Sequence, residues 1–143
     1  MHTIIREYSK TGELLVRIVE NHYDKTQYLE NVLYEISNEI NKKVINPELI
    51  LSIDKAIIYG HPDTNMYMLF LGVSIGYCCL YNQLEKANSL NSLARSLTKE
   101  EILPIIIGYY LNSLSQLKLI EGKIGESMQL VQQAIALIDK TYP

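Results

Sequence analysis

The sequence repeats itself at a shift of forty residues, and this self-similarity limits the folds open to it more than any other feature. When residues 82–97 are placed over residues 122–137, small or apolar side chains coincide at five positions. The pairs are Leu84 with Ile124, Ala87 with Ser127, Leu90 with Leu130, Ala94 with Ala134, and Leu97 with Leu137. Steps of three or four residues mark one face of an α-helix. A helical unit that recurs at such a period predicts an array of helical hairpins.

The same periodicity extends over the rest of the chain, and no segment shows the sustained period-two alternation of strands. Seven helices are expected, at about 12–22, 25–42, 47–59, 65–81, 83–97, 99–120 and 123–140. The expected N-caps are Asp24, Asn46, Asp63 or Thr64, and Thr98 in a capping box with Glu101. Gly60, Asn82 and Gly122 are expected to end helices. We therefore predict an all-α chain of about seven helices in antiparallel hairpins, with residues 1–143 in one domain.

Small residues add a second pattern to the repeat. Gly122 is followed by Ser127 after five positions and by Ala134 after seven more, and Asn82, Ala87 and Ala94 hold the same places one repeat earlier. In this respect residues 65–140 resemble the tetratricopeptide repeat, although their period is forty rather than thirty-four. The resemblance implies a right-handed array in which residues 65–140 form two hairpins and residues 1–60 a degenerate first hairpin or cap. An unrelated helical bundle is the alternative.

The resemblance also implies a binding groove, because tetratricopeptide arrays hold peptides against the first helix of each hairpin. By that spacing the groove residues are Leu69, Gly72, Gly76, Tyr109, Asn112 and Gln116. Glycine inside a helix costs about 1 kcal/mol relative to alanine, and either tight helix packing or a close partner explains the Gly-x-x-x-Gly of residues 72–76. Tyrosine is frequent, with eleven against one phenylalanine and no tryptophan. Tyrosine suits both half-buried packing and interfaces.

Motifs for catalysis, metal binding and nucleic-acid binding are not found. The three histidines, His2, His22 and His61, lack metal-ligand spacing, and there is no phosphate loop or nucleophile elbow. Adjacent Cys78 and Cys79 are expected to be buried, reduced thiols. The net charge of −3 disfavours a nucleic-acid binder. We predict a chain that is not an enzyme, with no catalytic residue, no metal and no cofactor, and no nucleic-acid partner.

The longest apolar segment, Met66–Tyr81, contains sixteen residues without a charge. A membrane span needs about 20 residues, so the segment predicts a buried helix and no membrane span. The N-terminus lacks a signal-peptide pattern, which favours the cytoplasm. Mean hydropathy is +0.01, and the apolar excess lies in residues 66–81 and 102–110. Such inner helices carry more apolar surface than a short array covers, so we expect a partner or a second copy.

These observations favour a non-enzymatic protein–protein interaction module. The expected ligand is a peptide or helix of a partner protein, which makes the chain an adaptor or chaperone. The content of Ile, Asn, Lys and Tyr is compatible with a bacterial source. The alternatives are a self-associating structural or regulatory protein, a homo-oligomer in that case, and a peptide-sensing regulatory domain.

Overall fold

The computed structural model describes residues 10–42 and 44–141, with side chains for residues 25–42 and 44–140. Every regular element in these ranges is an α-helix, which confirms the all-α prediction. The helices are α2 (Lys10–Glu39), α3 (Pro47–Tyr59), α4 (Thr64–Leu80), α5 (Leu84–Leu97), α6 (Pro104–Ile120) and α7 (Ile124–Thr141). The described ranges thus hold six helices where seven were expected.

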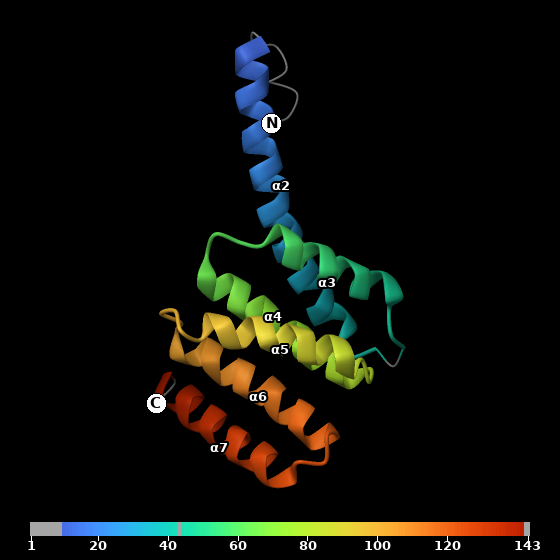
Figure 1. Cartoon of the computed structure of the whole chain (residues 1–143), viewed down its shortest axis with the longest axis vertical. Coiled ribbons are helices and arrows are strands. Elements are labelled where there is room, and N and C mark those ends of the chain that lie inside the picture. Colours follow the sequence, from blue (N-terminus) through green and yellow to red (C-terminus); the bar gives the residue numbers. More distant parts are fainter. Residues whose placement is uncertain (1–9, 43, 142–143) are drawn as a thin grey trace.

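The difference in number comes from α2, which is continuous through Asp24. The expected break there, with Asp24 as an N-cap, was wrong. No glycine or proline lies between residues 13 and 46, and an aspartate in a helix interior costs well under 1 kcal/mol. Nothing local therefore stops the helix. Its N-terminal half projects beyond the other helices (Figure 1).

The helices pair as the hairpins α2–α3, α4–α5 and α6–α7, and α4 packs against both α2 and α6 (Figure 1). The last two hairpins are offset by forty residues. Helix α4 spans 64–80 and α6 spans 104–120, and α5 and α7 begin at residues 84 and 124. We call α2, α4 and α6 the inner helices, and α3, α5 and α7 the outer helices.

The turns of the last two hairpins have the same geometry, as the sequence repeat predicts. Asn82 and Gly122 both adopt positive φ, at 59° and 81°. In each turn the following N–H reaches back five residues, from Gln83 to the carbonyl of Cys78 at 2.7 Å and from Lys123 to that of Lys118 at 2.9 Å. This is the Schellman ending, which satisfies carbonyls that a helix leaves unpaired. These two helix endings are thereby confirmed, and so is Gly60, which follows α3 with a φ of 70°.

Of the three N-caps assigned from the sequence besides Asp24, two are confirmed and one is wrong. The side chains of Asn46 and Asp63 accept backbone N–H bonds at the starts of α3 and α4. Thr98 instead closes α5, where its hydroxyl donates to the carbonyl of Arg95 at 2.7 Å. Helix α6 starts only at Pro104. A proline inside a helix clashes with the preceding turn, so the helix begins at the proline rather than at the capping box.

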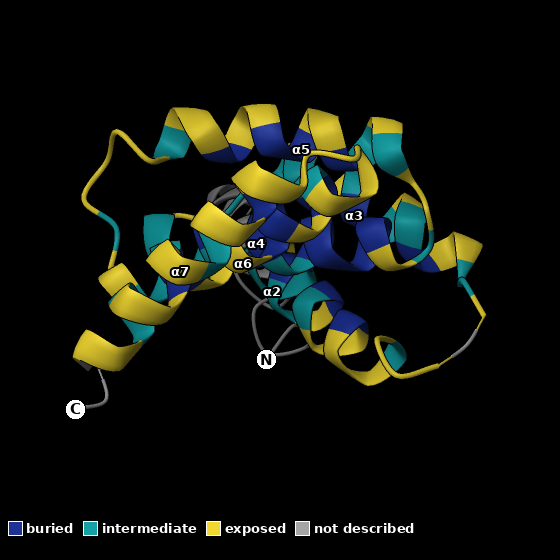
Figure 2. Cartoon of the chain, turned by 90° about the horizontal axis from the view of Figure 1, so that it is seen from below, coloured by how far each residue is buried: buried dark blue, intermediate teal, exposed yellow. Residues whose placement is uncertain are grey.

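Helix α4 forms the centre of the core, as the uncharged run of residues 66–81 predicts. Figure 2 shows it as the most buried helix, whereas α7 is largely exposed. Among its fully buried side chains are Phe70, Leu71, Ile75 and Tyr77. Across the described part of the chain, no helix combines the length and the apolar character needed to span a membrane.

Candidate functional site

Five of the six groove residues assigned from the sequence line one depression of about 300 Å³. They are Leu69, Gly76, Tyr109, Asn112 and Gln116. The depression lies between α4 and α6, with Ile40 just past the end of α2, and takes no lining residue from the outer helices. We call this surface the inner depression. Its volume is at the small end of ligand pockets, which suits a few side chains of a larger partner.

Three further residues complete the lining, namely Ile40, Val73 and Ser113. Val73 follows Leu69 by four residues and Ser113 precedes Gln116 by three, so helical spacing alone could have identified both. Ile40 carries no such signal, because only the packing of α2 against α4 brings it to this surface.

The two glycines of α4 differ in their surroundings. Gly72 is buried beneath α6, where an added Cβ would lie 3.4 Å from the Cα of Tyr110. An added Cβ would therefore make ordinary van der Waals contact with α6, and Gly72 does not line the depression. An added Cβ at Gly76 would lie 3.3 Å from the hydroxyl of Ser113. Gly76 thus serves both explanations, since it brings α6 close and also forms part of the lining.

Most tyrosines of the inner helices serve packing. The hydroxyl of Tyr67 donates to the carbonyl of Ile57 at 3.1 Å, and that of Tyr77 accepts the N–H of Asn46 at 3.1 Å. Tyr81 donates to the backbone at the end of α2, and Tyr110 bonds to α5, as described below. Tyr109 differs from these four, because it is 44% exposed beside the inner depression.

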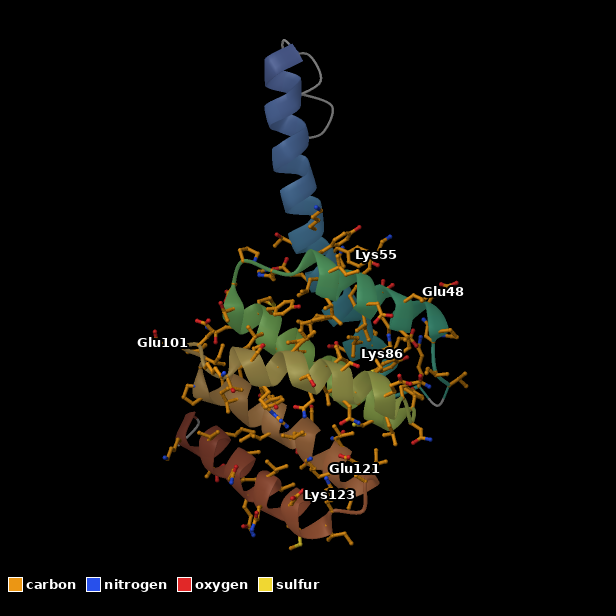
Figure 3. The ribbon with its side chains drawn as sticks, in the orientation of Figure 1. Glu48, Lys55, Lys86, Glu101, Glu121 and Lys123 are labelled. Atoms are coloured by element: carbon orange, nitrogen blue, oxygen red, sulfur yellow. The ribbon has the colours of Figure 1, made fainter. Side chains whose placement is uncertain are left out.

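The inner depression has no charged side chain in its lining. Helix α4 contains no charged residue and α6 contains only Lys118. The labelled charges in Figure 3 lie instead on outer helices and in turns, for example Lys55 on α3, Lys86 on α5 and Glu121 beside α7. Asn112, Ser113 and Gln116 supply uncharged hydrogen-bonding groups. The surface therefore fits a partner through apolar contact and neutral hydrogen bonds.

The two cysteines lie on the buried side of α4. Burial raises the pKa of Cys78 to about 12 and that of Cys79 to about 11, so both thiols stay protonated and unreactive near neutral pH. Cys78 is 0% exposed and Cys79 is 5% exposed. Within residues 25–42 and 44–140, no three His, Cys, Asp or Glu side chains are grouped as a metal site requires.

His61 has a structural place in the loop before α4. Its Nδ1 accepts the N–H of Asp63 at 3.0 Å, and its Nε2 lies 3.3 Å from a carboxylate oxygen of Glu30. These contacts hold His61 within the turn between α3 and α4. His2 and the side chain of His22 lie outside the described part of the chain.

A second hollow, of about 350 Å³, lies between α3 and α5. An ion pair between Lys86 and Asp54 crosses it. The charges of the pair neutralise each other, and Glu85 leaves the lining with one net negative charge.

Comparison with protein-family models, curated proteins and solved structures gave no match. The resemblance to tetratricopeptide repeats therefore rests on the small residues and the forty-residue offset alone.

Proposed function

We propose that this chain is a non-enzymatic protein-binding module, an adaptor or chaperone, whose inner depression holds an amphipathic helix or peptide segment of a partner protein. One observation supports it above all. Groove positions assigned from repeat spacing on two helices forty residues apart meet at a single surface. The hairpin offset of forty residues further supports a tetratricopeptide-like array.

The chemistry of the inner depression indicates what it would bind. Leu69, Val73 and Ile40 offer aliphatic contact, and Tyr109 offers a large, partly exposed ring. A helix laid in such a groove buries side chains at i, i+3, i+4 and i+7. The amides of Asn112 and Gln116 can donate to and accept from polar groups at the edge of that helix.

Affinity purification with the full chain as bait, from its native source and followed by mass spectrometry, tests the proposal. A partner recovered with the wild-type chain should be lost or reduced at least fivefold with Tyr109→Ala, because a tyrosine that acts as an interface hot spot contributes over 1 kcal/mol. Asn112→Ala should weaken binding in the same assay.

Tyr34→Ala is the matched control, because Tyr34 is 70% exposed on α2 and lies outside the inner depression. It should leave partner recovery unchanged. Circular dichroism should show all three variants folded. Equal recovery with the wild-type, Tyr109→Ala and Asn112→Ala chains would contradict the assignment of the groove.

A further inference from the structure

The chain leaves α2 differently from the other two inner helices. Helices α4 and α6 end in Schellman turns, in which Asn82 and Gly122 adopt positive φ and the following N–H bonds back to the helix. Between the end of α2 and the start of α3 at Pro47, none of the described residues has positive φ. The path of this connection, residues 40–46, therefore depends on other contacts.

Two tyrosines at the end of α4 supply such contacts. The hydroxyl of Tyr81 faces two carbonyl oxygens, that of Glu39 at 3.3 Å and that of Lys42, and shares its one proton between them. Toward α3, the hydroxyl of Tyr77 accepts the N–H of Asn46 at 3.1 Å. The backbone of the connection is thus bonded to α4 at both of its ends.

Tyr81 is itself held in place by packing. Its ring meets the ring of Tyr77 edge to face, with 4.9 Å between the two centroids, a favoured arrangement for aromatic pairs. Tyr77 is completely buried in the core. Because the ring of Tyr81 leans on a fixed neighbour, its hydroxyl is directed at one place and can set the position of the backbone that it binds.

Ile40 lies between the two carbonyls that Tyr81 binds. The N–H of Lys42 donates to the carbonyl of Glu39 at 3.0 Å, which closes the backbone around Ile40. The side chain of Ile40 lines the inner depression on the side of α2. Local bonds therefore shape this turn, whereas Tyr81 attaches the turn to α4, the helix that forms the next part of the lining.

We propose that Tyr81 is a positioning residue of the inner depression, although it does not line the depression itself. Its hydroxyl fixes the turn of residues 39–42, so that Ile40 is in place before a partner binds. Without the hydroxyl, binding would have to order this turn, and ordering side chains and loops lowers affinity. The effect on a partner rests on the proposed function, whereas the fixing of Ile40 does not.

Methyl NMR of the full chain tests the fixing of Ile40 without any ligand. Tyr81→Phe keeps the ring and removes the hydroxyl. The order parameter of the Ile40 δ-methyl group should fall, and the amide of Lys42 should exchange with solvent roughly fivefold faster, as the loss of one ordinary hydrogen bond implies. Ile53, which is fully buried, is the internal reference, and its methyl order should not change.

Tyr67→Phe is the matched control, because it removes the same group from the same helix. The hydroxyl of Tyr67 donates to the carbonyl of Ile57 on α3 at 3.1 Å, and Tyr67 does not line the inner depression. Both variants should lose some stability, but only Tyr81→Phe should loosen Ile40. An Ile40 methyl group that stays equally ordered in Tyr81→Phe, or that loosens equally in Tyr67→Phe, would overturn the proposal.

The affinity purification proposed above tests the consequence for binding. Recovery of the partner protein should fall roughly threefold with Tyr81→Phe and should stay unchanged with Tyr67→Phe. In an Ile40→Ala chain, adding Tyr81→Phe should cause no further fall in recovery, because the side chain through which Tyr81 acts has been removed. A further fall of the same size would assign the effect to general stability and overturn the positioning role.

Tyr109→Ala separates this inference from the proposed function. If Tyr109→Ala lowers recovery and Tyr81→Phe does not, the inference fails and the proposed function stands. If Tyr109→Ala leaves recovery unchanged, the assignment of the groove fails, and the order of the Ile40 methyl group alone then decides whether Tyr81 fixes the turn.

Discussion

A single buried hydrogen bond between the last two hairpins gives the sharpest test of the packing. The hydroxyl of Tyr110 on α6 donates to the side-chain oxygen of Asn91 on α5 at 2.5 Å. The two side chains are only 4% and 6% exposed, so neither has water as a substitute partner. Burial also raises the pKa of Tyr110, which keeps the hydroxyl protonated as the donor at neutral pH.

Tyr110→Phe removes one oxygen atom and leaves the ring in place. A buried polar group left without its partner costs about 1–3 kcal/mol, so the free energy of unfolding should fall by about 2 kcal/mol. The melting temperature should fall by roughly 6 °C, given about 3 °C per kcal/mol for a chain of this length. Urea unfolding followed by far-UV circular dichroism measures the change as a lower midpoint at constant slope.

The double variant Asn91→Leu with Tyr110→Phe separates the hydrogen bond from side-chain packing. Replacing both partners by apolar groups of similar shape is nearly neutral, so the double variant should be more stable than Tyr110→Phe alone. The coupling energy from the complete cycle should be at least 1 kcal/mol. A Tyr110→Phe chain within 0.5 kcal/mol of wild type, or costs that simply add, would refute a buried bond between the hairpins, since variation below about 0.5 kcal/mol is ordinary for surface changes.

Three further predictions concern the backbone and the thiols. Gly72→Ala should stabilise the chain by up to about 1 kcal/mol, because its Cβ has room, whereas Gly108→Ala should not gain this, because its Cβ would lie 2.9 Å from Ile138; thermal unfolding compares the two. Asp63→Ala should lose about 1 kcal/mol of stability with the N-cap of α4, measured by urea unfolding. Cys78 has its folded pKa raised from 9.0 to about 12, so stability should fall as pH rises above 9, by up to about 1.4 kcal/mol per unit, and Cys78→Ala should flatten that slope.

Much of the local structure could be predicted because it depends on contacts within a few residues. The N-caps Asn46 and Asp63 and the endings at Asn82 and Gly122 use side chains and φ preferences that act inside one turn. The errors at Asp24 and Thr98 arose where two local signals competed. Aspartate is both a good cap and a tolerable interior residue, and the proline at 104 excluded the helix start that the capping box favoured.

Part of the candidate site was likewise predictable from the sequence, and part depended on how the helices pack. The groove spacing implied by the resemblance to tetratricopeptide repeats, applied at the forty-residue shift, selected Leu69, Gly76, Tyr109, Asn112 and Gln116. Ile40 lines the depression only because α2 packs on α4, and Gly72 does not line it because α6 covers this residue.

The sequence by itself determined that this chain is helical, where most helices begin and end, and that two hairpins repeat at forty residues, since all of these follow from local periodicity and capping. Only the tertiary structure decided which apolar helix faces are buried against neighbouring helices. Ile135 and Ile138 of α7 look alike in the sequence, yet Ile138 lies against Gly108 of α6 and Ile135 is 52% exposed. The reason is physical. An apolar pattern in the sequence favours burial of a helix face, but only the packing of the neighbouring helices determines which side chains on that face are buried.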